Sequence, residues 1–354
     1  MHRRDFVKTA GAVGTVGAAG LAGCLGDDDS NGNGSGNGNG NGNGNGEPDF
    51  PTDALTWMIP WSEGGGTDQY ARQLAPLIDE SLGQPVEIDN RPGAGSLVGS
   101  QWLTEQAGDG YTFGAANSPA LEFTWYTEEI DDWSVESFEP IAYVGVFGYT
   151  LVANAEYGIT DFGALRDAYN DGELENFAYQ GVGSDSHWLT MTLRDEYDLG
   201  FQNAVPYDGG GPVMEAVVSD EVPAGFATNA AAQAQVEDGV VDMVVNLMDV
   251  DLDHAFPDLD YISNYGDSLA WLTENRLTLI APEGTPETER QAIADAAEYA
   301  TGHESTDEWV EETGNVIEYG DMDAAADHLE ESLERIRENV DVEAFQQLIE
   351  EEES

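Results

Sequence analysis

The sequence contains very little positive charge. Of its 354 residues, 11 are Lys or Arg and 70 are Asp or Glu, which gives a formal net charge of −59 at pH 7. An acidic excess of this size repels the phosphates of nucleic acids and the headgroups of anionic lipids. The composition therefore excludes nucleic-acid binding and polybasic attachment to a membrane surface.

Lysine is almost absent, because Lys8 is the only one and the other basic residues are arginines. Short, hydrated carboxylates in place of lysine stems are typical of proteins from near-saturating salt, where the Debye length falls to about 3 Å or less. We therefore expect a halophilic source, with an acidic protein from low salt as the alternative.

Cysteine occurs once, at Cys24, so no intramolecular disulfide can form. It lies in a run of small apolar residues from Thr9 to Leu25, which follows the paired arginines of HRRDFVK (2–8). This arrangement resembles a twin-arginine export signal, and its apolar part, about 15 residues, is shorter than a membrane-spanning helix. The run contains the sequence LAGC, which resembles a lipoprotein cleavage box. We expect residues 1–24 to be a twin-arginine lipoprotein signal with Cys24 as the lipidated residue; a buried free thiol is the alternative.

The segment after the signal has no apolar residue to bury. From Gly26 to Gly46 the chain reads GDDDSNGNGSGNGNGNGNGNG, which cannot offset the entropy of ordering. We expect a disordered Asn/Gly-rich tether over residues 25–49, spanning roughly 25 Å on average. Signal, anchor and tether together favour a cell-surface receptor, enzyme or structural lipoprotein.

Strand and helix patterns alternate through the rest of the chain, whose 8 Trp, 14 Tyr and 12 Phe can build a core. A buried-strand run at 55–60 precedes a helix whose apolar face extends to Leu82. Thr67 or Asp68 can cap the start of this helix, and Gly83 can cap its end. This order implies parallel strands with right-handed crossovers, in two α/β units with a helical tail. Further strands are expected at 86–88, 111–115, 141–146, 149–152, 177–180, 204–206, 224–226, 241–246 and 277–281, and further helices at 97–103, from 161, from 186, at 212–218, at 230–238 and after 286.

Seven segments stand in order between residues 53 and 345: WMIPWSEGGGTDQYAR (57–72), LGQPVEIDNRPGAGS (82–96), DGYTFGAANS (109–118), FEPIAYVG (138–145), GVGSDSHWL (181–189), VPYDGGGPVMEAVVSDEV (205–222) and LIAPEGTP (279–286). Together they resemble the extracytoplasmic solute-binding receptors of tripartite tricarboxylate transporters, the Bug receptor family, in a lipoprotein of haloarchaeal type.

The resemblance implies an α/β, two-lobe periplasmic-binding-protein-like (type II) fold with mixed sheets and a helical C-terminal tail. Lobe one would comprise residues 50–150 plus 276–354, and lobe two residues 151–275. The implied function is capture of a small organic carboxylate (a tricarboxylate, dicarboxylate or related acid) for membrane permease subunits. The protein would be a monomer, lipid-anchored on the extracellular face of the cell membrane, without a cofactor. Asp208 and the ATNAAA segment after Phe226 depart from the family's usual residues and leave the ligand's identity open.

The residues themselves indicate an anion site. A strand, a Gly-rich turn and a helix start, as at 60–68, leave backbone NH groups unpaired at the positive end of a helix dipole. A second such turn runs from Gly181 to His187, and Tyr207 with the glycines after it could reach a ligand from lobe two. Arg72 and Arg91 are the nearest cations, although pairing with surface acids is their expected use. The predicted ligand-binding residues are Pro60, Trp61, Ser62, Gly64, Gly65, Gly66, Thr67, Asp68, Asn117, Ser118, Gly183, Ser184, Ser186, His187, Tyr207 and Asn229.

Two other classes of function stay open. Asp185, Ser186 and His187 suggest a secreted hydrolase or esterase, but adjacent residues rarely form a triad and the chain has no G-x-S-x-G elbow. A surface lipoprotein without a small ligand is the third possibility. The remaining histidines after the signal, His254, His303 and His328, lack metal-ligand spacing, so we expect neither a metal site nor enzyme activity.

Overall fold

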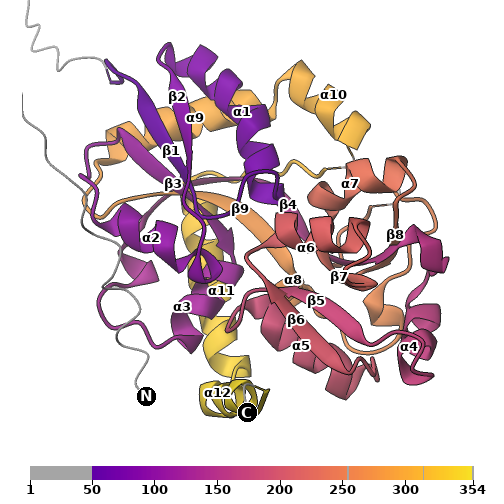
Figure 1. Cartoon of the computed structure of the whole chain (residues 1–354). Coiled ribbons are helices and arrows are strands. Elements are labelled where there is room, and N and C mark those ends of the chain that lie inside the picture. The colour runs from indigo at the N-terminus through magenta and orange to yellow at the C-terminus, as the bar shows by residue number, and fades with distance from the viewer. Residues whose placement is uncertain (1–49, 253–254, 314, 353–354) are drawn as a thin grey trace, which may run out of the picture. The chain divides into compact units, whose positions relative to one another are not determined.

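The computed structural model describes residues 50–252, 255–313 and 315–352 (Figure 1). The predicted signal, the tether, Cys24 and His254 lie outside these residues. The described residues belong to one compact unit.

The described residues form a nine-stranded mixed sheet in the order β2-β1-β3-β9-β4-β7-β5-β6, with β8 paired to β4. In the first half of the sheet, β1 pairs in parallel with β2 and β3. In the second half, β5 pairs in parallel with β6 and β7. Both parallel groups were predicted. In Figure 1 these two groups lie on opposite sides of β4 and β9. The strands are β1 (Leu55–Ile59), β2 (Val86–Asn90), β3 (Thr112–Ser118), β4 (Glu139–Asn154), β5 (Asn176–Gln180), β6 (Asn203–Tyr207), β7 (Ala224–Thr228), β8 (Val241–Asn246) and β9 (Glu274–Ala281).

Strand β4 connects the two halves. The prediction of two strands at 141–146 and 149–152 was wrong, because β4 is continuous. As far as Gly148 it pairs antiparallel with β9, and from Tyr149 it pairs with β7 and β8. A Cβ at Gly148 would lie 2.0 Å from the carbonyl oxygen of Thr273, so only glycine permits this close approach.

The helices follow the predicted alternation, with α3 and α8 as additions. Gly83 caps the end of α1 in the left-handed conformation, as predicted. The predicted caps at its start were wrong, because Gly65 is the N-cap and no side chain bonds there. The helices are α1 (Gly66–Leu82), α2 (Leu97–Thr104), α3 (Ala120–Thr127), α4 (Phe162–Asn170), α5 (Asp185–Glu196), α6 (Gly210–Val218), α7 (Asn229–Glu237), α8 (Ala270–Thr273), α9 (Glu287–Thr301), α10 (Glu304–Thr313), α11 (Met322–Asn339) and α12 (Val342–Glu352).

None of the helices within the described ranges has both the length and the apolar content needed to cross a bilayer.

The C-terminal helices contact the cores of both halves. Leu333 and Ile336 of α11 and its C-cap residue Val340 are buried. Leu333 joins a cluster beneath the first half of the sheet, whereas Ile336 and Val340 join the core of the second half together with Phe345 of α12. The helical tail therefore adds a second connection between the halves beside β4 and β9.

Tyr70 fixes the position of α1. Its ring is fully buried, and its hydroxyl donates to the carbonyl oxygen of Val146 on β4 (3.0 Å) and accepts from the amide of Val316 (3.0 Å). A Cβ at Gly145 would lie 2.4 Å from the Tyr70 ring, so the strand is in close contact with the ring. One side chain thus holds α1, β4 and the segment before α11 together.

We predict that Tyr70→Phe lowers the free energy of unfolding by about 1–3 kcal/mol, because the part-buried amide of Val316 loses its acceptor and the carbonyl oxygen of Val146 loses its donor. Denaturant unfolding measures the change. Tyr299→Phe is the control, because Tyr299 is 40% exposed and its hydroxyl reaches Glu80 at the surface; this variant should change stability by less than about 0.5 kcal/mol. Equal effects of the two substitutions would contradict the assigned role.

Candidate functional site

A narrow cavity lies between the two halves of the sheet, beside the point where β4 passes from one to the other. Its volume is about 30 Å³, close to the space that one or two water molecules occupy. Every residue on its wall is uncharged. These residues are Trp61, Ser62, Gly65, Gly66, Thr67, Asn117, Ala120, Phe147, Tyr149, Gln180, Gly210, Gly211, Thr228 and Asn275.

Two helix N-termini from different halves of the molecule reach this cavity. Helix α1 begins at Gly66 after its cap Gly65, and α6 begins at Gly210 after its cap Gly209. The amides of Gly66, Thr67, Gly210 and Gly211 have no acceptor among the residues that the structure describes. Unpaired amides at a helix N-terminus carry partial positive charge, so both ends favour an anion between them.

Side chains add further donors. The indole nitrogen of Trp61 and the amide nitrogen of Gln180 are buried and have no hydrogen-bond partner within the described chain. Trp61 follows β1 in the first half, and Gln180 ends β5 in the second. A buried donor without an acceptor is costly, so an acceptor placed in the cavity would relieve both groups.

The two walls touch directly. A Cβ at Gly66 would lie 2.7 Å from the hydroxyl oxygen of Thr228, which caps α7 in the second half. The Ser62 hydroxyl donates to the carbonyl oxygen of Asp208 (3.2 Å). Only glycine at position 66 lets the halves approach this closely. Of the three glycines in the turn, Gly64 alone has a positive φ, +79°.

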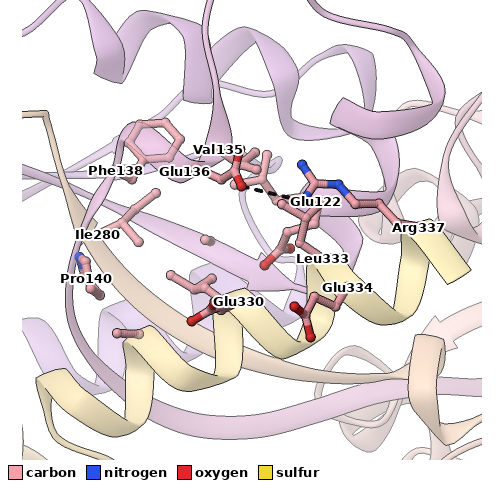
Figure 2. A pocket seen from close by; sticks show the side chains of 14 residues that line it. Glu122, Val135, Glu136, Phe138, Pro140, Ile280, Glu330, Leu333, Glu334 and Arg337 are labelled. Atoms are coloured by element: carbon pink, nitrogen blue, oxygen red, sulfur yellow. Dashed lines mark ion pairs between the residues drawn. The ribbon is translucent and has the colours of Figure 1, made fainter.

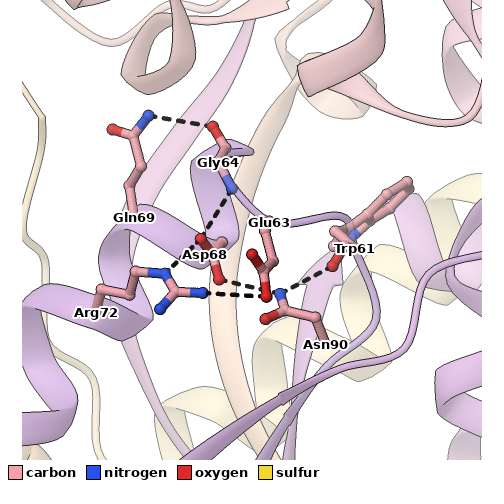
Figure 3. Close-up of polar contacts among 7 residues, drawn as sticks. All are labelled: Trp61, Glu63, Gly64, Asp68, Gln69, Arg72 and Asn90. Atoms are coloured by element: carbon pink, nitrogen blue, oxygen red, sulfur yellow. Dashed lines mark hydrogen bonds and ion pairs between the residues drawn. The ribbon is translucent and has the colours of Figure 1, made fainter.

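A hydrogen-bond network around Asp68 sets the shape of the first turn (Figure 3). Its carboxylate accepts from the amide of Gly64 (2.9 Å), from Arg72 Nε (2.7 Å) and from Asn90 Nδ2 (3.0 Å). The same side-chain nitrogen of Asn90 also donates to the carbonyl oxygen of Trp61 (3.0 Å). Burial opposes ionisation of Asp68, but these hydrogen bonds outweigh it and lower the pKa of the carboxyl. The network connects the turn to the start of α1 and to the end of β2.

Both nearby arginines pair with acids, as expected. Arg72 lies 2.7 Å from Asp68 and 3.8 Å from Glu63. Arg91 lies 2.7 Å from Asp89 and covers the ring of Trp102 at 3.7 Å. Neither lines the cavity, so its donors are backbone amides and neutral side chains.

The predicted second turn, from Gly181 to His187, uses its polar groups within the chain. The amide of Gly183 donates to His187 Nδ1 (3.1 Å), and the amide of His187 donates to the hydroxyl of Ser184 (3.2 Å). The Ser186 hydroxyl accepts from the amide of Gln180 (2.9 Å) and lies 2.9 Å from the Ser184 hydroxyl. The His187 ring stacks on Tyr179 with 4.6 Å between ring centroids. These residues support the cavity wall from behind, through Gln180.

The structure thus divides the sequence-predicted site residues. On the cavity wall lie Trp61, Ser62, Gly65, Gly66, Thr67 and Asn117. Tyr207 bonds to Glu221 at 3.0 Å instead, and Asn229 accepts from the amide of Gly148 at 3.1 Å. Away from the wall lie Pro60, Gly64, Asp68, Ser118, Gly183, Ser184, Ser186, His187, Tyr207 and Asn229.

Sequence reasoning did not select the residues that strands β4, β5, β7 and β9 bring to the wall: Phe147, Tyr149, Gln180, Thr228 and Asn275. The signal available for Gly210 and Gly211 was the strand, glycine turn and helix start that repeats the pattern of residues 60–68. No comparable local signal marks the strand residues, which stand in ordinary buried runs.

A buried carboxyl lies directly behind the wall. Tyr149 donates its hydroxyl to Asp185 Oδ1 (3.2 Å), and Asp185 Oδ2 has no partner in the described structure. Burial raises the pKa of Asp185 to about 7. No group of three His, Cys, Asp or Glu side chains suited to a metal ion occurs in the described residues.

Asp185 makes stability depend on pH. The native state keeps its proton up to about pH 7, whereas the ordinary pKa is 3.8, so native stability falls as the pH rises between these values. Asp185→Asn removes this loss. The free energy of unfolding of Asp185→Asn minus that of the wild type should therefore increase by on the order of 2 kcal/mol from pH 5 to pH 8. Denaturant unfolding at both pH values measures the gain.

Asp195→Asn is the matched control, because Asp195 is exposed on the same helix and its loss also removes one acid. A stability difference between Asp185→Asn and wild type that stays constant with pH would contradict the prediction.

Comparison with known proteins places the chain in a family. Residues 70–341 match the model of the family described as "Tripartite tricarboxylate transporter family receptor". Protein BugT of Bordetella pertussis is 27% identical over 240 residues, which cover 67% of this chain and 72% of BugT. A UPF0065 protein of the same organism is 26% identical over 254 residues, covering 71% of this chain and 77% of that protein.

Solved structures share the fold. MatC from Rhodopseudomonas palustris with bound malate has a TM-score of 0.71 at 22% identity, covering 82% of this chain and 99% of that chain. R. palustris Rpa4515 with adipate has a TM-score of 0.72 at 22% identity, covering 84% and 98%. Periplasmic binding protein BugD has a TM-score of 0.70 at 20% identity, covering 86% and 98%.

These similarities confirm the predicted two-lobe, periplasmic-binding-protein-like α/β fold; the lipoprotein signal and the haloarchaeal type stay predictions. Because the family match spans most of the sequence, the chain belongs to the tripartite tricarboxylate transporter receptor family.

Proposed function

We propose that this protein is an extracytoplasmic solute-binding receptor that captures a small organic carboxylate for the membrane permease subunits of a tripartite transporter. The observation that carries the proposal is the convergence of two helix N-termini, one from each half, on a cavity with uncharged walls. The relatives bound to malate and adipate support the same ligand class.

The donors suit one carboxylate group. Its oxygens would accept from the amides of Gly66 and Thr67 on one side and of Gly210 and Gly211 on the other, with Trp61 and Gln180 completing the shell. Each hydrogen bond to a charged group contributes about 1.5–3 kcal/mol. Four or five such bonds are sufficient for micromolar affinity after the cost of closure.

The net charge of −59 does not prevent binding of an anion. Salt screens charges beyond about 10 Å at 0.1 M and beyond about 3 Å at 1 M, whereas the donors in a closed cavity act at hydrogen-bond distance. The cavity wall itself carries no carboxylate, and the nearby Asp68 is paired with Arg72.

The cavity volume of about 30 Å³ corresponds to a closed arrangement of the halves. A di- or tricarboxylate requires more space, so its entry requires the lobes to separate along β4 and β9. The bound form would be closed over the ligand but wider at the cavity than the arrangement described, and ligand binding would shift the population toward it through contacts made by both walls at once.

We extend the proposal to the lobes and the N-terminus. Lobe one would comprise residues 50–150 plus 276–354 and lobe two 151–275, which is supported by the change of strand partners at Gly148 and Tyr149. Residues 1–24 would be a twin-arginine lipoprotein signal, with Cys24 acylated and residues 25–49 as tether. The receptor would act as a monomer at the extracellular face of the membrane of a halophile.

We propose no covalent chemistry for this site. The hydrolase alternative requires Ser186 and His187 to face a substrate, but Ser186 is bonded to Gln180 and Ser184, and His187 stacks on Tyr179. Neither residue lines the cavity.

A melting screen of the full chain tests the function. Malate, adipate and citrate are the probes, and the diamide of malate is the uncharged control. Binding to the native state at about 100 times Kd adds about 2.7 kcal/mol to stability, so at least one acid should raise the melting temperature while the diamide should not. If none of the acids shifts the melting temperature, the receptor proposal is wrong.

Gly66→Ala tests the closed geometry. The added Cβ would meet Thr228 at 2.7 Å, so we expect at least tenfold weaker carboxylate binding by calorimetry, whereas alanine favours helix α1 itself. Gly302→Ala is the control, because Gly302 is the C-cap of α9, far from Gly66 in the sequence. A Cβ there would lie 3.4 Å from its nearest neighbour, an ordinary contact distance. Wild-type affinity in Gly66→Ala would exclude the proposed contact between the walls.

A further inference from the structure

A second and larger cavity shares no lining residue with the candidate functional site. Its volume is about 320 Å³, at the lower end of the roughly 300–1,000 Å³ of small-molecule pockets. It is enclosed by α3, α11, the short helix at Val135–Ser137, and strands β3, β4 and β9 (Figure 2). Leu121, Val135, Phe138, Ile280 and Leu333 make much of the wall apolar.

One carboxylate in this wall is buried. Glu122 is 1% exposed, and the Ser118 hydroxyl donates to its Oε1 at 2.6 Å. Its Oε2 is buried without a hydrogen-bond partner in the described structure. This glutamate therefore differs from the many solvated acids of the surface, because burying an unpaired charged oxygen is costly.

The rim of the cavity is also acidic. Glu136, Glu330 and Glu334 are exposed and line it, together with a single cation, Arg337. Figure 2 shows Arg337 extending from α11 toward Glu136, with 3.5 Å between the paired atoms. Since this pair neutralises itself, the charge left for a ligand is negative and comes from Glu122, Glu330 and Glu334.

We propose that this cavity is a second ligand site, for a small organic cation that carries a primary ammonium group on an apolar body. The ammonium group would pair with the carboxylate of Glu122, which lines the cavity, and the apolar body would contact Leu121, Phe138 and Leu333. The rim acids would attract the cation from solution.

Other ligand classes fit less well. An anion would be repelled by the rim and would leave Glu122 unpaired. A bare metal ion needs several oxygen ligands at close range, whereas the buried part of the wall supplies one carboxylate among apolar groups. A neutral apolar molecule would fill the volume but leave Glu122 Oε2 without a donor.

Calorimetric titration of the full chain with benzylammonium at pH 8 and fixed ionic strength tests the site. We use this pH because burial raises the pKa of Glu122 to about 7, and the ionised form is the one that binds. Benzyl alcohol and benzoate have the same ring with no charge or the opposite charge. We expect benzylammonium to bind at least tenfold more tightly than either analogue, a comparison that requires no variant.

Glu122→Gln keeps the shape of the side chain and removes its charge, so benzylammonium binding should weaken at least tenfold. Glu330→Gln on the exposed rim is the matched control, with an expected loss of less than threefold. The proposal is overturned if benzylammonium fails to bind, if benzyl alcohol binds equally well, or if the two variants lose affinity equally. The last outcome would indicate general attraction to the acidic surface.

Discussion

The rest of the structure depends on the pairing of β4 with different partners along its length. As far as Gly148 the strand bonds to β9, and from Tyr149 it bonds to β7 and β8. The residues on either side of this change, Phe147 and Tyr149, line the candidate site. The cavity therefore lies where two separately built half-sheets meet, and its shape depends on how closely they approach.

Charge is distributed in a way that separates surface from site. Most of the acids that give the chain its large negative charge lie at the surface, whereas the wall of the narrow cavity has only neutral groups and backbone amides. Helix dipoles and amides are fixed by the fold and remain unchanged when surface residues are replaced. An acidic surface can therefore accumulate without destroying an anion site of this kind.

Much of the fold was predictable because its elements have strong local patterns. The helix face ending at Gly83 and the buried strand at 241–246 each show a clear periodicity, and both were confirmed. The continuity of β4 was not predictable, because Gly148 resembles a break in sequence and is required for a close backbone contact in space. The first turn of the candidate site was visible for the same local reason, as glycines between a strand and a helix.

The sequence by itself determined the family, through seven ordered segments that resemble it. It also determined most of the order of strands and helices, which follows from periodicity over short stretches, and the acidic character of the surface, which follows from composition. The tertiary structure decided which glycine turn faces the first one. Two similar turns follow β5 and β6, but the amides after β5 bond to Ser184 and His187, whereas those of Gly210 and Gly211 reach the cavity. That choice depends on contacts between segments far apart in the chain, which no local pattern records.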